Sequence, residues 1–278
     1  MTSTRTRAFA NRLTRGMLAA AAASVLLAGP AAAQNSGNVS MSAGADIVNQ
    51  YYFRGIIQET GGFIMQPFLD ASISFGNASI TAGTWSSLHS RGDAGFDGAP
   101  EAFYETDFYA GIGGAAGPVG IDVTYTAYMS PRGSWGTTKE VALGLSFDSV
   151  AAPYATFAFE TAGGAEGGPN KGTYFELGVE PSAPLDGPVG LSFPVALGMS
   201  LNNYFEYMDA SGSLTDAKFG FFSVGASIGY EFDTPEEYGT WGLGLGISAL
   251  VFGEGLKAIN GEDSGVKPIA LFGLSVGY

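Results

Sequence analysis

Apolar and polar residues alternate with a period of two along most of this chain, and the segment 267–278 (KPIALFGLSVGY) shows the pattern plainly. Ala270, Phe272, Leu274, Val276 and Tyr278 fall on one face of this segment. A period of two predicts a β-strand, here with one apolar face. We expect that face to be covered by something outside the chain, with the last strand of a soluble β-sandwich as the alternative.

Twelve segments of about ten residues repeat this alternation, and ten residues is the length of a tilted strand that crosses a bilayer. In segment 119–129, for example, Val123 and Tyr125 lie opposite Asp122 and Thr124. In all twelve segments the apolar face carries no carboxylate. The segments are 39–49, 64–75, 78–87, 102–112, 119–129, 139–148, 153–160, 173–180, 189–202, 219–232, 241–251 and 267–278.

This sorting decides between the two all-β folds. A soluble sandwich places its charges outside and its apolar residues between the sheets, whereas a transmembrane barrel places its apolar residues outside. We therefore predict an all-β fold, a single antiparallel up-and-down transmembrane β-barrel of about twelve strands, with ten or fourteen strands as alternatives.

The connections between these segments alternate in length, which supports the same fold. Long connections (50–63, 88–101, 130–138, 161–172, 203–218 and 252–266) alternate with shorter ones (76–77, 113–118, 149–152, 181–188 and 233–240). Long external loops and short periplasmic turns are typical of transmembrane barrels, so both termini are expected in the periplasm. No connection is identified as a dedicated constriction loop.

Aromatic residues near the strand ends are expected to form two girdles at the membrane interfaces. The outer girdle would contain Trp85, Tyr104, Phe159, Phe175, Tyr204 and Phe222, and the inner one Phe75, Phe147, Phe193, Tyr230, Trp241 and Tyr278.

Residues 1–33 have the pattern of a secretory signal peptide, so the barrel domain is expected to span residues 34–278. Four arginines precede the apolar run 17–28, and Ala31-Ala32-Ala33 gives a small-residue cleavage site. The chain has 12 basic and 26 acidic residues, and removing the four arginines leaves 8 against 26, a net charge of −18. Such an acidic protein is not expected to bind nucleic acid. It has no cysteine, which excludes disulfides and thiolate chemistry.

The region from Asp46 to Phe147 resembles the TorF-type porins of Gram-negative bacteria. The matching positions are Tyr52-Phe53-Arg54-Gly55-Ile56, Gln66, Gly83, Trp85-Ser86, the run Glu105-Thr106-Asp107-Phe108-Tyr109-Ala110-Gly111, Tyr125, Tyr128 and Lys139-Glu140. The resemblance implies an outer-membrane β-barrel with pore activity.

Strand parity places many carboxylates on the inward face, opposed there only by Arg54 and Lys267. They are Asp46, Asp70, Glu105, Asp107, Asp122, Glu140, Asp148, Glu160, Glu176, Glu180 and Glu231. Rings of acid attract cations. Arg54 is expected near the outer end of the first strand, at the height of several of these acids. The candidate pore constriction is therefore Arg54 with Glu105, Asp107, Glu140, Glu160 and Glu176. Inward glycines either open space or let strands pack under inward aromatic residues.

The function expected from these features is a porin-like channel for small hydrophilic solutes with a preference for cations. The alternative is a closed barrel, plugged by ion pairs, with a structural or surface-interaction role. An outer-membrane hydrolase that uses His89, the only histidine, with Ser86, Ser87 and Asp93 nearby is a remote alternative; otherwise no enzymatic activity is expected.

No cofactor or metal site is expected, because the acidic loops lack a closing bidentate glutamate. The expected partners are outer-membrane lipid, periplasmic chaperones and the barrel-assembly machinery, together with small solutes or cations. Phe272, Leu274, Val276 and Tyr278 form the candidate membrane-insertion signal.

Overall fold

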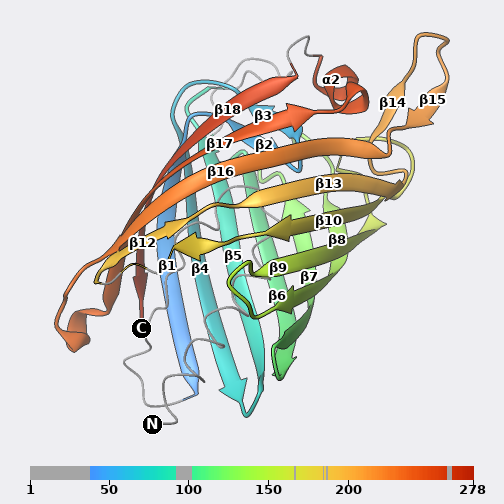
Figure 1. The fold of residues 1–278 in the computed structure, drawn as a ribbon. Helices are drawn as coiled ribbons and strands as arrows, with labels where there is room; N and C mark the ends of the chain where they lie inside the picture. The colour runs from blue at the N-terminus through green and yellow to red at the C-terminus, as the bar shows by residue number, and fades with distance from the viewer. Residues whose placement is uncertain (1–37, 92–101, 166, 184, 186, 262–264) are drawn as a thin grey trace.

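The chain forms a closed antiparallel barrel of twelve strands (Figure 1). The computed structural model describes residues 38–91, 102–165, 167–183, 185, 187–261 and 265–278. Consecutive strands pair with each other, β1 pairs with β18, and pairing of β16 with β17 closes the ring. The strands are β1 (Val39–Val48), β4 (Ile64–Phe75), β5 (Ala78–His89), β6 (Glu105–Ala116), β7 (Val119–Met129), β8 (Thr138–Phe147), β9 (Pro153–Ala162), β10 (Thr173–Val179), β12 (Val189–Ser192) with β13 (Val195–Asn202), β16 (Phe219–Glu231), β17 (Thr240–Phe252) and β18 (Val266–Gly277). The predicted fold class and all twelve predicted strands are confirmed.

The ninth strand differs from its prediction because it is interrupted between β12 and β13. Pro194 lies at the break and has no N–H to donate to a ladder. Beyond this break, β12 pairs with the two-residue strand β11 (Ser182–Ala183) instead of β10.

The two ends of the barrel differ, and we call them the turn end and the loop end. The turn end holds the short connections, residue 278 and the start of β1, where Met41 and Tyr278 exchange backbone hydrogen bonds. It also carries the 3-10 helix η2 (Glu236–Tyr238). The loop end carries the longer connections, with two hairpins, β2 (Tyr51–Phe53) with β3 (Ile56–Glu59) and β14 (Glu206–Met208) with β15 (Leu214–Asp216), and helix α2 (Glu254–Asn260). Within the described residues, no helix is long and apolar enough to span a membrane.

The predicted sorting of side chains between the two faces of the barrel is confirmed. On β7, Ile121 and Val123 are 50% and 43% exposed, whereas Asp122 and Thr124 between and beside them are each 6% exposed. The inward carboxylates Asp46, Asp70, Glu105, Asp107, Asp122, Glu140, Glu160 and Glu176 are all buried. Asp148, Glu180 and Glu231 lie at the turn end, outside the buried set. The large exposed apolar surface of the strands therefore surrounds a polar interior, as in transmembrane barrels.

The segment predicted as a membrane-insertion signal lies on this outer apolar surface. Phe272, Leu274 and Tyr278 are exposed and Val276 is half-buried, while Leu271 and Gly273 on the opposite face of β18 are buried.

The predicted outer girdle is wrong for three of its aromatic residues. Trp85, Tyr104 and Tyr204 are at most 5% exposed and pack inside the barrel. Phe159 and Phe222 of the same set are exposed on the outer surface. The misplaced rings pack against chain that enters the barrel from the loop end, which strand parity cannot reveal.

Several inward glycines lie directly beneath an aromatic ring of the neighbouring strand. A Cβ at Gly83 would lie 2.4 Å from Asp70 Oδ1 and 2.6 Å from the Tyr109 hydroxyl. Gly83 therefore leaves room for the hydrogen bond that Tyr109 donates to Asp70 across the strand between them (2.5 Å). Gly178 and Gly198 lie beneath Tyr154 and Phe221 in the same way. Of the two roles predicted for inward glycines, close packing is the one observed at these positions.

Candidate functional site

The connection between β1 and β4 folds back into the barrel as the β2–β3 hairpin. Phe53 pairs with Ile56, so Arg54 and Gly55 form a two-residue turn, and both have positive φ angles, 49° and 83°. Positive φ at both central positions is the type I′ geometry that suits the twist of a tight hairpin. Gly55 adopts this geometry without strain, whereas Arg54 does not.

The two faces of this hairpin pack against opposite walls of the barrel. Tyr51 contacts Trp85 of β5 (ring centroids 5.5 Å apart), and Phe53 contacts Tyr128 of β7 (5.1 Å). On the other face, Tyr52 contacts Phe252 of β17 (5.4 Å). The hairpin therefore lies across the interior of the barrel near the loop end, and its residues 51–54 and Ile56 are at most 6% exposed.

The sequence-based placement of Arg54 at the end of the first strand is therefore wrong. The first long connection instead contains a segment that folds into the interior of the barrel, which strand parity did not predict. The apolar triplet Tyr51–Phe53 and the pair Ile56-Ile57 flank an Arg-Gly dipeptide, and two such runs around a two-residue turn are a hairpin signal. That signal could have found the hairpin but not its position inside the barrel.

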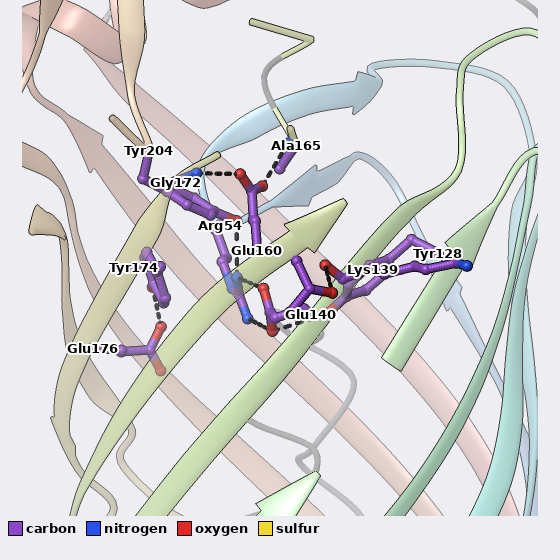
Figure 2. Close-up of polar contacts among 11 residues, drawn as sticks. Arg54, Tyr128, Lys139, Glu140, Glu160, Ala165, Gly172, Tyr174, Glu176 and Tyr204 are labelled. Carbon is purple, nitrogen blue, oxygen red and sulfur yellow. Dashed lines mark hydrogen bonds and ion pairs between the residues drawn. The ribbon is translucent and has the colours of Figure 1, made fainter. Parts of the chain in front are cut away.

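The guanidinium of Arg54 is held by the barrel wall at the centre of this site (Figure 2). Its Nη1 and Nη2 donate to the two carboxylate oxygens of Glu140 on β8, at 2.6 and 2.8 Å, and Nη1 also donates to the Tyr204 hydroxyl at 2.8 Å. The guanidinium carbon lies 4.4 Å from the ring centroid of Tyr174 and 5.4 Å from that of Tyr204. Burial is the largest single influence and acts to lower the pKa of Arg54, but the charge and hydrogen bond of Glu140 together with the nearby Tyr204 and Tyr128 outweigh it, so the pKa is raised and the guanidinium stays charged.

The other acids predicted at the constriction fall into two groups. Near Arg54, Glu160 accepts the backbone N–H groups of Ala165 (2.7 Å) and Gly172 (2.5 Å), and Glu176 accepts the Tyr174 hydroxyl (Figure 2). Glu176 also accepts the Tyr154 hydroxyl. Glu160 is therefore hydrogen-bonded to the connection between β9 and β10 and Glu176 to tyrosines of the wall, and the structure shows no hydrogen bond from Arg54 to either carboxylate.

Glu105 and Asp107 lie on β6 against the opposite face of the hairpin. The Tyr51 hydroxyl donates to Glu105 at 2.9 Å. Burial, followed by the charges of Glu105 and Asp107, raises the pKa of Tyr51 well above its ordinary range, so this hydroxyl keeps its proton. The hairpin therefore has two polar attachments to the wall, Tyr51 to Glu105 and Arg54 to Glu140.

Helix α2 covers the turn of the hairpin from the loop end. Asn260 donates from Nδ2 to the Gly55 carbonyl (2.8 Å) and accepts the Ile57 N–H at Oδ1 (2.9 Å). A Cβ at Gly55 would lie 2.5 Å from Leu256 of the same helix, so glycine also permits this close approach.

His89 lies inside the barrel and not on an exposed rim loop. Its Nε2 is 2.8 Å from the Ser87 hydroxyl, its Nδ1 is 3.9 Å from Glu59, and its ring stacks on Tyr104 at 4.4 Å. The residue types of a hydrolytic relay thus meet here, but Ser87 is fully buried, and 3.9 Å is too long for a hydrogen bond. Ser86 faces outward towards Thr106, and Asp93 lies outside the described residues.

Within the described part of the chain, no group of three His, Asp or Glu side chains is placed to hold a metal ion. The buried atoms there that lack a hydrogen-bond partner include Asp46 Oδ2, Asp107 Oδ1 and Arg54 Nε.

Two solved structures match this chain over most of its length, both at low sequence identity and with TM-scores below 0.5. The NanC porin is 11% identical, with a TM-score of 0.48, and the match covers 86% of this chain and 98% of that one. The translocator domain of the autotransporter NalP from Neisseria meningitidis is 12% identical, with a TM-score of 0.43, covering 100% and 96%. No curated protein sequence matches this chain.

One family model covers most of the chain, from residue 32 to residue 241. It therefore includes the hairpin, Arg54 and every acid of the candidate constriction. The chain belongs to this family, described as bacterial proteins of unknown function (Gcw_chp).

Proposed function

We propose that this protein is an outer-membrane channel that is closed near its loop end by the β2–β3 hairpin. When the hairpin moves aside, the channel passes small hydrophilic solutes with a preference for cations. The observation that carries this proposal is the buried hairpin itself, which lies across the interior near the loop end and packs there through two hydrophobic faces and through polar contacts to Glu105 and Glu140. The acids that line the wall supply the preference for cations.

The placement of the protein in its membrane belongs to the same proposal. The apolar outer surface faces outer-membrane lipid, both termini lie in the periplasm and the loop end faces outward. The signal peptide of residues 1–33, which lies outside the described residues, directs export. Periplasmic chaperones and the barrel-assembly machinery recognise the last strand. We also propose that the protein is a TorF-type porin. The residues between Asp46 and Phe147 that resemble this family support that assignment.

Conductance in planar lipid bilayers tests the channel. The wild-type protein is expected to give rare or small steps, and a variant with residues 51–59 replaced by a Gly/Ser linker is expected to give steady, larger steps. In a salt gradient, the reversal potential of this variant should have the sign of cation preference. The matched control replaces the tip of the β14–β15 hairpin, residues 209–213, by a linker and should behave as wild type.

The second candidate function is a permanently closed barrel with a structural or surface-interaction role. The specific observation in its favour is the continuous hydrophobic core that joins Tyr52 and Ile56 of the hairpin to Phe252 and to Leu256 of α2. If the variant without the hairpin folds but gives no conductance, the channel proposal fails and this candidate replaces it. Anion preference in that variant would contradict the proposed selectivity.

A further inference from the structure

Among the described residues, the contacts around the Arg54 guanidinium come mainly from outside the hairpin, from two wall strands and from the connection that follows β13. Glu140 lies on β8, Tyr174 on β10 and Tyr204 directly after β13, and only Phe53 (4.9 Å from the guanidinium carbon) belongs to the hairpin. Each of these wall residues is at most 2% exposed. A carboxylate fork and two aromatic faces around the guanidinium therefore belong to parts of the chain outside the hairpin.

The charge balance of this wall favours a cation. Within the described residues, Arg54 is the only Lys or Arg side chain that is fully buried, whereas Glu140, Glu160 and Glu176 are all buried around it. Withdrawal of Arg54 would leave three carboxyl groups and no resident cation.

The shape of the site favours a planar cation. Glu140 uses both oxygens to accept two parallel N–H bonds, and a guanidinium presents such a pair of donors in one plane. The same plane stacks on aromatic rings, which a compact ammonium group does less well. Arg54 Nε has no partner among the described residues, so recognition depends on the outer fork and not on the arginine stem.

The backbone conformation at position 54 independently supports a specific role for the arginine side chain. Position 54 has φ 49°, which favours glycine, asparagine or aspartate in a type I′ turn. Arginine at this position adds backbone strain, and strain of this kind persists where the side chain has a specific role.

We propose that the wall residues Glu140, Tyr174 and Tyr204 form a binding site for small guanidinium cations, which the Arg54 side chain occupies as a tethered ligand. Solutes that carry a guanidinium group would displace Arg54 and so favour withdrawal of the hairpin. The part of this inference that makes guanidinium compounds the solutes of the channel rests on the proposed function. Binding of guanidinium at the site does not, and it is tested without measuring conductance.

The test empties the site and adds the ligand back. Arg54→Gly removes the side chain and also relaxes the turn, so this variant is expected to fold. Ethylguanidinium should raise its thermal unfolding temperature in a saturable way, with an affinity at least about tenfold higher than that of ethylammonium at equal ionic strength. Wild-type protein should show little response, because its tethered arginine competes at an effective concentration on the order of millimolar or above.

Matched variants make the result specific. Arg54→Gly combined with Glu140→Gln should lose the response to ethylguanidinium, whereas Arg54→Gly combined with Lys139→Gln, which changes an exposed neighbour on the same strand, should keep it. Absence of a saturable response in Arg54→Gly, or an unchanged response after Glu140→Gln, would overturn the proposal and leave Arg54 as a latch only.

Two further measurements keep the proposal testable if Arg54→Gly does not fold. Arg54→Asn also suits the turn and should respond to ethylguanidinium in the same way. In wild-type protein, ethylguanidinium at concentrations high enough to compete with the tethered side chain, but not ethylammonium at the same concentrations, should speed hydrogen exchange of the Phe53 and Gly55 amides. Equal exchange with both would overturn the site. If the variant without the hairpin gives no conductance, the channel proposal fails, but the binding of ethylguanidinium would still stand.

Discussion

Arg54 joins a strained backbone to a fully buried charge, and both are stabilised by the same contacts. Its guanidinium is 0% exposed and forms two hydrogen bonds with Glu140, while its φ of 49° lies in the left-handed region. A buried ion pair offsets its desolvation only when the geometry is good and further hydrogen bonds are present. Here Tyr204 and the face of Tyr174 supply those further contacts.

Removing one partner of this pair should be much more costly than removing both. Arg54→Met leaves Glu140 buried without its cation, which is expected to lower the free energy of unfolding by about 3–5 kcal/mol. The double variant Arg54→Met/Glu140→Met should lose less than Arg54→Met alone. Denaturant unfolding of the protein in lipid vesicles measures all three.

The exposed pair of Lys257 and Glu254 on α2 provides the control for this comparison. Glu254 has an 87% exposed side chain, so Lys257→Met should change stability by no more than about 1 kcal/mol. An equal cost for Arg54→Met and Lys257→Met would show that the buried pair does not stabilise the hairpin.

At the scale of elements, the strands were predictable and the hairpin inside the barrel was not. Each barrel strand has one face on the outer surface and one on the interior, so its composition records both environments in a period of two. The β2–β3 hairpin is buried on both faces, and Tyr51, Tyr52 and Phe53 are all buried, so no alternation remains to be read. The same cause explains why Trp85 and Tyr104, which pack near this hairpin, were misplaced in a girdle.

The sequence predicted which residues lie inside the barrel, but not which of them pair with each other. Parity correctly placed Glu105, Glu140, Glu160 and Glu176 inside the barrel. It could not show that, of these four acids, Arg54 pairs with Glu140, because that distance depends on how a connection folds. The role of all these residues as a pore constriction remains a prediction.

Helix α2 is the element that holds the turn of the hairpin in place. Asn260→Ala removes two hydrogen bonds to the hairpin backbone, each of which contributes about 0.5–1.5 kcal/mol. Hydrogen exchange at the Ile57 amide is therefore expected to become about tenfold faster or more, because the hairpin opens more often. Mass spectrometry of exchanged fragments measures this.

Lys257→Ala on the same helix is the matched control, since Lys257 makes its hydrogen bond to Glu254 and not to the hairpin. It should leave exchange at Ile57 unchanged. Equal effects of the two substitutions would indicate that Asn260 acts through the helix and not through its bonds to the hairpin.

At the scale of the whole molecule, apolar side chains are sorted to the outer surface of the barrel and acidic side chains to its interior. The outer surface carries apolar side chains, such as Leu69 on β4 at 45% exposure, and the interior carries the acids. Leu69→Arg should therefore lower the free energy of unfolding in lipid vesicles, by about 2–4 kcal/mol for a position near the bilayer midplane. Ser72→Arg, on the inward face of the same strand, should cost less because it meets the acidic interior. Equal losses would contradict the assignment of the two faces.

The same sorting leads to a prediction about ion selectivity in the barrel without its hairpin. Asp70 and Asp122 lie on the interior face below the hairpin, and each is buried in the wall of the barrel. Asp70→Asn/Asp122→Asn should shift the reversal potential towards zero, because fixed charge lining a narrow passage acts on every ion that crosses it. Asp209→Asn in the exposed β14–β15 loop removes an equal charge. Its effect should be small, because salt screens a charge on the protein surface within about 10 Å. If both substitutions shift the potential equally, the cation preference arises from the overall acidity of the protein and not from its interior wall.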